Sequence, residues 1–206
     1  MDKMPVLGFV ILSFLSGAVP YSVILGKLFL RKDIREYGDG NPGGANAWRA
    51  GGPAFGLLAI LLDFLKAYYP VHYASASLHL SQNLLMAVAI APVAGHAFSP
   101  FLCFRGGKAV AATYGIWFGL YGLSDGLLVM ALTSALFYLI QTVDAWTVLM
   151  GMNALLAYLF LSKAETSVRL LCLANLSIVA YKHRKDLKPM RLRPALATMV
   201  RGSRSI

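Results

Sequence analysis

The chain has 206 residues, of which 58% are hydrophobic and only 14% are charged, and its mean hydropathy is +0.63. A water-soluble domain of this size cannot bury so much apolar surface, which excludes soluble enzymes, disordered chains and small disulfide-rich secreted modules and makes the lipid bilayer the expected solvent. The net charge of +10 suits an anionic membrane face, and no soluble basic region is present that would bind nucleic acid.

Seven apolar segments follow one another along the chain, and we expect each to be a helix. The first, Met4–Gly26, carries no charge over 23 residues, which is enough to cross a bilayer. A cleaved signal peptide is the alternative for this segment, but the apolar run continues past the expected cleavage point. The other six are Pro53–Tyr73, Leu78–Ala94, Ala109–Leu123, Leu127–Val143, Trp146–Leu161 and Val168–Tyr181. Several are shorter than the roughly 20 residues of a full crossing, so one can be re-entrant and five to seven crossings agree with the sequence.

The basic residues predict the orientation of these helices. Residues 31–53, 95–108, 142–146 and 182–206, placed on one side, hold 14 of the 19 Lys and Arg residues. The positive-inside rule makes that side cytoplasmic and leaves the N-terminus outside. We therefore expect an all-α integral membrane protein, a bundle of about seven transmembrane helices with a cytoplasmic C-terminus. It forms a single domain over residues 1–206, with the bundle in 1–187 and a basic, headgroup-binding cytoplasmic tail in 188–206.

The first cytoplasmic loop, Asp33 to Arg49, has a composition typical of an anion site. Within seven positions it holds five turn-forming residues, Gly38, Gly40, Pro42, Gly43 and Gly44. Turns of this kind let successive backbone N–H groups point at an anion. Arg35 and Arg49 would add charge-assisted contacts to a phosphate. The alternative is a sharp interfacial turn whose arginines meet lipid headgroups.

The second cytoplasmic loop ends in Gly106-Gly107-Lys108, directly before a predicted helix. The N–H groups at a helix N-terminus, two glycines and a lysine together favour an anion. The spacing is not that of a Walker P-loop, and a single Gly-Gly-Lys is weak evidence on its own.

Two further patterns lie within the predicted helices. Asp63 and Lys66 are three residues apart on one face, where they are expected to form a structural ion pair, with direct substrate contact as the alternative. Gly115 and Gly119 have the spacing that predicts close packing of two helices.

Several chemistries are excluded by missing patterns. No histidine is followed five positions later by aspartate, so the HxxxxD signature of common glycerolipid acyltransferases is absent. HExxH is absent as well, and carboxylates are too sparse for a two-metal site, so no metal and no cofactor is expected. Cys103 and Cys172 lie in apolar stretches, which argues against a disulfide and against a thiolate metal site.

Four short motifs occur together in one order. They are Gly40-Asn41-Pro42-Gly43 with Asn46 and Arg49; Asp63-Phe64-Leu65-Lys66; Gly95-His96 with Phe104-Arg105-Gly106-Gly107-Lys108; and Tyr181-Lys182-His183-Arg184. In order and spacing they resemble the acyl-phosphate:glycerol-3-phosphate acyltransferase family (PlsY) of bacteria, over the whole chain. The resemblance implies a seven-helix enzyme of the bacterial inner membrane, multi-pass, with its active site facing the cytoplasm. Such an enzyme makes lysophosphatidic acid from acyl phosphate and glycerol 3-phosphate.

The resemblance also implies roles for individual residues. Arg49, Lys108 and His183 match residues that hold or activate the phosphorylated substrates. The positions that match substrate-binding residues are Asp39, Gly40, Asn41, Asn46, His96, Gly106, Gly107 and Thr147. The implied partners are acyl phosphate, glycerol 3-phosphate or a related glycerol derivative, and membrane lipids. No nucleic acid and no obligate protein partner is expected.

The expected reaction needs no covalent nucleophile. An acyl phosphate is already activated, so the acceptor hydroxyl can attack it directly while phosphate leaves, which agrees with the absence of a Ser-His-Asp or Cys-His pattern. Lys108, Arg49 and glycine amides would position the substrates and stabilise charge on the leaving phosphate. His183, His96 or a substrate phosphate oxygen would receive the proton, and the sequence does not distinguish between them.

The chain departs from the family pattern at several of these positions. Serine is replaced by Asp39, threonine by Ala45 and Ala112, and asparagine by Asp186. A carboxylate at position 39 would repel a bound phosphate unless it pairs with Arg35 or Arg49, turns to solvent or is matched to another acceptor. An altered acceptor or lost activity is therefore an alternative function. A small-anion or metabolite transporter is a weaker one, because the polar clusters lie at one face and not at the bilayer midplane.

Overall fold

The computed structural model describes residues 6–194. These residues form nine α-helices: α1 (Val6–Ala18), α2 (Tyr21–Leu25), α3 (Gly44–Gly51), α4 (Pro53–Ser77), α5 (Gln82–Ala97), α6 (Val110–Tyr121), α7 (Asp125–Ile140), α8 (Asp144–Leu161) and α9 (Thr166–His183). A π-helical turn at Gly26–Leu30 and 3-10 turns at Ile34–Glu36 and Pro100–Leu102 complete the regular structure of this part. The predicted start of the first span at Met4 and residues 195–206 of the predicted tail lie outside the described residues.

Each of the seven apolar segments is largely helical in the structure, as predicted. Three runs in the described chain are long and apolar enough to cross a membrane, Pro53–Ser77, Gln82–Leu102 and Asp144–Leu161, and α1 together with Tyr21–Leu30 makes a fourth if the bent pair counts as one span. α6, at about 18 Å, is shorter than the hydrocarbon core of roughly 30 Å. The fold is all-helical with three or four candidate spans, and the higher number of crossings stays a prediction.

The first predicted span is not one continuous helix, because it breaks after α1. The helical stretch that begins with α2 runs at 41° to α1. Pro20 accounts for the break, since proline lacks an N–H and its ring clashes with the carbonyl four residues earlier. Two buried side chains satisfy carbonyl groups at the break: Ser99 Oγ donates to Ala18 O at 2.6 Å and Lys66 Nζ donates to Val19 O at 2.7 Å.

The second half of the first cytoplasmic loop is helical, where an irregular loop to Arg49 was predicted. α3 begins after Gly43, which is extended, and is followed by Gly52 with a φ of +84°, a conformation that favours glycine. Pro53 then opens α4 at the first helical position, where its missing N–H costs nothing. Arg49 therefore projects from the last turn of a helix and not from a loop.

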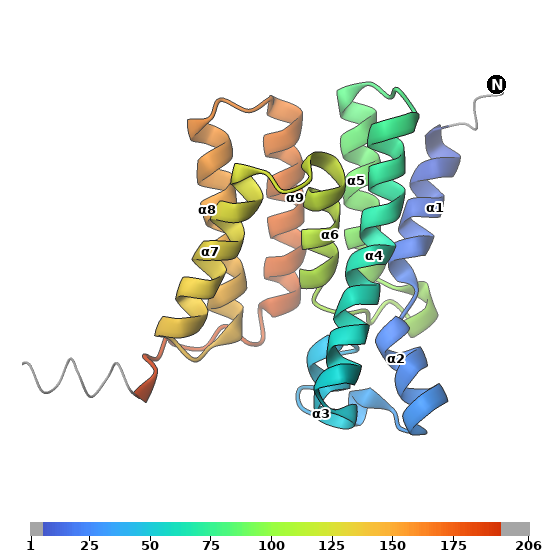
Figure 1. The fold of residues 1–206 in the computed structure, drawn as a ribbon, viewed down its shortest axis with the longest axis vertical. Coiled ribbons are helices and arrows are strands. Elements are labelled where there is room, and N and C mark those ends of the chain that lie inside the picture. Colours follow the sequence, from blue (N-terminus) through green and yellow to red (C-terminus); the bar gives the residue numbers. More distant parts are fainter. Residues whose placement is uncertain (1–5, 195–206) are drawn as a thin grey trace, which may run out of the picture.

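Close helix packing brings distant loops to one end of the bundle. A Cβ on Gly115 would collide with the carbonyl of Phe64, and one on Gly119 would lie 3.0 Å from that of Tyr68, which confirms the predicted close packing of α6, here against α4. α1 packs on α5, α7 on α8, and α9 on both α5 and α8. α2, α3, the α5–α6 connection and the chain after α9 consequently share one end, shown at the bottom of Figure 1. The α4–α5, α6–α7 and α8–α9 connections lie at the other end, near the N-terminus.

The described part of the predicted tail lies against the bundle. Backbone N–H groups of Thr142 and Arg193 donate to the carbonyls of Arg191 and Ile140 at 3.0 and 2.9 Å. The indole of Trp146 donates to the carbonyl of Lys188 at 2.9 Å. These contacts fix the chain after α9 over the turn between α7 and α8.

Candidate active site

A cavity of about 460 Å³ lies at the end of the bundle that holds α3. The predicted site residues among those that line it are Asp39, Asn41, Arg49, His96, Lys108 and His183. They come from the loop before α3, from α3 itself, from the end of α5, from the loop before α6 and from the end of α9. Arg49, Lys108 and His183, which are far apart in the sequence, thus face one space.

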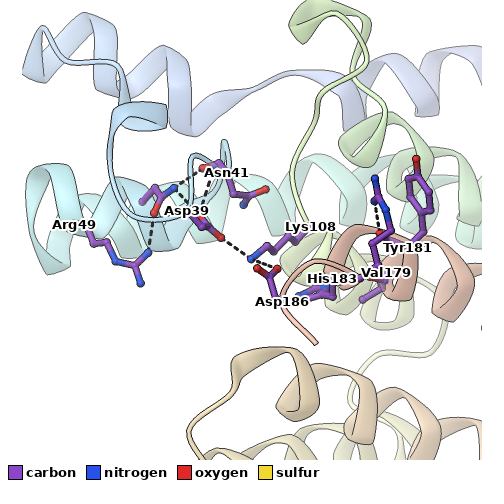
Figure 2. A network of polar contacts seen from close by, with 10 residues as sticks. Asp39, Asn41, Arg49, Lys108, Val179, Tyr181, His183 and Asp186 are labelled. Carbon is purple, nitrogen blue, oxygen red and sulfur yellow. Dashed lines mark hydrogen bonds and ion pairs between the residues drawn. The ribbon is translucent and has the colours of Figure 1, made fainter. Parts of the chain in front are cut away.

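Lys108 places its ammonium between two carboxylates (Figure 2). Its Nζ is 2.6 Å from Oδ2 of Asp39 and 2.7 Å from Oδ2 of Asp186. Burial alone lowers the pKa of Lys108, but hydrogen bonds and charge from the two carboxylates raise it above its usual value, so the side chain stays protonated. Three segments of the chain therefore meet at a single ammonium group.

Asp39 is anchored within its own loop as well. Its Oδ1 accepts hydrogen bonds from Asn46 Nδ2 at 2.8 Å and from the backbone N–H of Asn41 at 3.1 Å. Burial raises the pKa of Asp39, but the donors Lys108, Asn41 and Asn46 outweigh it and lower the pKa to about 2. The carboxylate is therefore ionised, and each of its two oxygens accepts at least one hydrogen bond.

Neither arginine considered as a partner of Asp39 in the sequence pairs with it. Arg35 binds Asp33 instead, with an Nη2–Oδ2 distance of 2.6 Å. Arg49 donates from Nη1 to Oδ1 of Asn46 at 2.7 Å. The partner is Lys108, which was predicted to lie at the same site but not to pair with Asp39.

The two histidines of the cavity differ in their surroundings. His183 Nδ1 lies 2.9 Å from the carbonyl oxygen of Val179 (Figure 2). A carbonyl only accepts, so Nδ1 of the neutral ring carries the hydrogen and Nε2 keeps its lone pair. His96 is enclosed: its Nδ1 is 3.7 Å from Oδ1 of Asp63, and a Cβ on Gly107 would collide with its Nε2. Nε2 of His183 is therefore better placed to accept a proton than either ring nitrogen of His96.

The two glycines before Lys108 are required for close packing. A Cβ on Gly106 would collide with the carbonyl of His96, and the N–H of Gly107 donates to that same carbonyl at 3.0 Å. The amide of Gly107 is therefore directed at the protein, where the sequence predicted an approach to phosphate.

A second hollow, of about 570 Å³, adjoins the first and shares Asp39, Asn41 and Lys108 with it. The predicted residues Gly40 and Gly106 line this outer hollow and not the cavity. Its other charged lining residues are Arg105, Lys182, Arg184, Lys185 and Asp186. The outer hollow is thus rich in cations, whereas Arg49 and Lys108 are the only lysine or arginine among the described residues that line the inner cavity.

Thr147 and the ion pair in α4 lie at the margins of this site. Thr147 accepts a hydrogen bond from Gln141 Nε2 at 2.8 Å and lines a separate cavity of about 120 Å³ between α6, α7 and α8. The expected ion pair of Asp63 and Lys66 is present, with an Nζ–Oδ1 distance of 2.6 Å and both side chains buried. Asp63 also lines the inner cavity, so the alternative prediction of a direct contact between Asp63 and substrate agrees with its position.

Two acidic residues at the site were missed as functional candidates. Asp186 was noted as a replacement, but not as a partner of Lys108; its place three residues after His183 is the one signal that the sequence offered. Asp144, at the start of α8, lines the cavity and belongs to no recognisable motif. Within residues 6–194, no three His, Cys, Asp or Glu side chains are grouped to hold a metal ion.

Known proteins are similar to this chain in sequence and in fold. Residues 7–192 match the family model described as glycerol-3-phosphate acyltransferase. The chain is 36% identical over 191 residues to glycerol-3-phosphate acyltransferase 1 of Thermotoga maritima, covering 86% of this chain and 93% of that protein. It is 32% identical over 188 residues to the glycerol-3-phosphate acyltransferase of Pelagibacter ubique, covering 91% and 95% of the two chains. A crystal structure of PlsY (YgiH), an integral membrane glycerol 3-phosphate acyltransferase in its glycerol 3-phosphate form, matches with a TM-score of 0.83 and 26% identity over 94% of this chain and 98% of that chain.

Proposed function

The chain belongs to the glycerol-3-phosphate acyltransferase family as an integral membrane enzyme of the PlsY type, and we propose that its acyl donor is an acyl phosphate and its acceptor a hydroxyl of glycerol 3-phosphate. The products are then lysophosphatidic acid and inorganic phosphate. The PlsY structures described as the glycerol 3-phosphate and lysophosphatidic acid forms support this acceptor and this product by analogy.

The observation that carries the proposal is the convergence of Arg49, Lys108 and His183 on one cavity. Arg49 and Lys108 supply the positive charge that a phosphate group requires, and a guanidinium can bind two phosphate oxygens at once. On the apolar side the cavity is bounded by Ile60, Phe64 and Val148. A fatty acyl chain would lie along this side while the phosphate faces the two cations.

The reaction is a direct acyl transfer. The acceptor hydroxyl oxygen attacks the carbonyl carbon of the acyl phosphate, a new ester C–O bond forms, and the bond to the phosphate oxygen breaks with its electron pair leaving on phosphate. Nε2 of His183 accepts the hydroxyl proton, because Nδ1 is engaged with Val179. The described residues that line the cavity include no serine, threonine or cysteine, which favours a path without an acyl-enzyme.

The enzyme would lie in the bacterial inner membrane with this cavity at the cytoplasmic face. Both substrates would then reach the site directly, glycerol 3-phosphate from the cytosol and the acyl phosphate from the membrane surface. The basic lining of the outer hollow, including Arg105 and Lys185, agrees with a cytosolic entry for an anionic acceptor.

Purified protein, supplied with acyl phosphate and glycerol 3-phosphate, tests the proposal by the rate of lysophosphatidic acid formation. Lys108→Ala should lower that rate by at least about 10²-fold, as loss of a group that stabilises transition-state charge does. Lys163→Ala, at the opposite end of the bundle, is the matched control and should keep the rate. If the wild-type protein forms no lysophosphatidic acid but acylates another glycerol derivative, glycerol 3-phosphate is not its acceptor and that derivative takes its place.

A further inference from the structure

The contact that the acyl-transfer proposal does not explain is the pair of carboxylates on Lys108. Asp39 and Asp186 come from opposite ends of the chain, yet both place an oxygen within 2.7 Å of the same Nζ atom. The exposed fractions of the three side chains lie between 24% and 38%, so solvent and small ions reach the cluster. Figure 2 shows Lys108 between them. The same lysine lines both the inner cavity and the outer hollow.

This cluster is negative as a whole. Both carboxylates accept from the ammonium, and the ionised state of Asp39 is secured by a pKa of about 2. Two of the three N–H groups of Lys108 are already used by protein oxygens. A phosphate oxygen that approaches Lys108 therefore meets two negative charges beside one positive charge, and it binds well only if a carboxylate gives way.

The two carboxylates differ in how firmly they are held. Asp39 is fixed by hydrogen bonds from the side chain of Asn46 and the backbone of Asn41, at 2.8 and 3.1 Å. Among residues 6–194, the side-chain contact of Asp186 is its ion pair with Lys108, at 2.7 Å. Asp186 lies in the turn after α9 and is the carboxylate that can move away more easily.

Arg49 offers a contrast within the same cavity. It donates to the amide oxygen of Asn46 at 2.7 Å, and no carboxylate in the described part of the chain lies within ion-pair distance of it. An anion can bind Arg49 without displacing any acidic group, whereas at Lys108 it has to compete. The two cations of the cavity thus differ in their availability to phosphate.

We infer that Asp39 and Asp186 are selectivity residues, which act as internal competitors for Lys108 and lower the affinity of the site for a free phosphate ion. An acyl phosphate gains further contacts along the apolar wall, and a glycerol phosphate gains a contact between its hydroxyl and His183. These contacts offset the competition, and inorganic phosphate makes neither of them, although it too can reach Arg49. Inorganic phosphate, the leaving group, has only its oxygens and is released. The inference rests on the proposed function for the identity of the leaving group, but not for the binding site itself.

Binding of inorganic phosphate to the purified, full-length protein in detergent tests this inference by calorimetric titration at low, constant ionic strength. Asp39→Asn keeps an oxygen that can accept from Asn41 and Asn46 but removes the charge, and Asp186→Asn does the same at the other carboxylate. Each change should lower the Kd for phosphate about tenfold, equal to about 1.4 kcal/mol. The double variant should bind more tightly than either.

The control is Asp33→Asn, which removes a carboxylate at the same end of the bundle that pairs with Arg35 and not with Lys108; its Kd should equal that of the wild type. Phosphate should also inhibit acyl transfer at lower concentration in the Asp39 and Asp186 variants. An unchanged or higher Kd in the double variant, at unchanged thermal stability, would overturn the inference. If phosphate binds more tightly to the variants while the wild type forms no lysophosphatidic acid, the inference stands and the proposed function fails.

Discussion

His183 is the residue on which the direction of proton transfer depends. Its Nδ1 is engaged with the carbonyl of Val179, so the ring presents Nε2 to substrate. Replacing His183 by Gln should lower kcat by about 10²–10⁴-fold, because a positioned general base contributes that much, with a smaller change in KM. The measurement is steady-state formation of lysophosphatidic acid at several pH values.

The control for this variant is His79→Gln, which changes an exposed histidine in the connection between α4 and α5, at the opposite end. It should leave kcat unchanged. If His183→Gln turns over at the wild-type rate, a phosphate oxygen of a substrate accepts the proton instead. A large effect of His96→Gln alone would point to the other ring.

Asp39 also predicts how stability depends on pH. Its pKa in the folded protein, about 2, is lower than its usual value of 3.8. A depressed pKa stabilises the folded state fully above 3.8, and this contribution is lost as the pH falls from about 4 toward 2. Thermal unfolding in detergent, followed from pH 5.5 to pH 3, should therefore show a steeper loss of Tm for the wild type than for Asp39→Asn. Equal slopes in the two proteins would mean that the pair with Lys108 does not stabilise the fold.

At this scale, the sequence predicts residue types better than it predicts partners. Arg49, Lys108 and His183 could be named because each belongs to a short motif, and the structure places all three at one cavity. The pairing of Lys108 with Asp39 and Asp186 could not, because it joins three segments whose proximity results from helix packing. With nine acidic residues in the chain, spacing alone does not identify the two that face one lysine.

At the scale of elements, a charge pair in α4 stabilises the break that Pro20 makes between α1 and α2. Lys66 both pairs with Asp63 and donates to the carbonyl of Val19 that the break exposes. Lys66→Met should lower the free energy of unfolding by about 3–5 kcal/mol, because it leaves a buried carboxylate without its partner. Thermal unfolding of the purified protein measures this.

Lys163→Met, which removes an exposed lysine at the far end of the bundle, serves as the control and should change stability little. The double variant Asp63→Leu, Lys66→Met should recover part of the loss, since a buried ion pair can be replaced by apolar side chains at small cost. A single variant as stable as the wild type would show that the pair is not structural.

The same region shows what hydropathy can and cannot predict about elements. Uncharged length identifies where helices run, and each predicted segment is largely helical. It does not locate breaks inside an apolar run, and Pro20, the residue that causes one, is itself compatible with an uncharged segment. α3 was not predicted because two of its eight residues are glycines, which disfavour a helix.

At the scale of the whole molecule, charge is divided unequally between the two ends of the bundle. The end with α2, α3 and the turn after α9 holds Lys108 and the basic residues of the outer hollow. The end with the α8–α9 connection holds Lys163 in that connection and Arg169 in the first turn of α9. This division was predictable, because it follows from the number of basic residues in each loop, which can be counted without knowing how the helices pack. The distribution within the basic end was not: the structure pairs Lys108 with two carboxylates and leaves Arg49 without an acidic partner among the described residues.

Two cysteines in the natural sequence allow the predicted orientation to be tested directly. Cys103 is exposed in the connection between α5 and α6, at the end that we place in the cytosol, and Cys172 is buried in α9. A membrane-impermeant maleimide should therefore label inverted vesicles at Cys103 and leave intact spheroplasts unlabelled, since a thiol reacts only from the side where it is exposed. In a Cys103→Ser background, Lys163→Cys should show the reverse pattern. Labelling of Cys103 from outside would show that the protein has the opposite orientation. The site would then face away from a cytosolic acceptor, and Arg105 and Lys185 could not form the entry path of that acceptor.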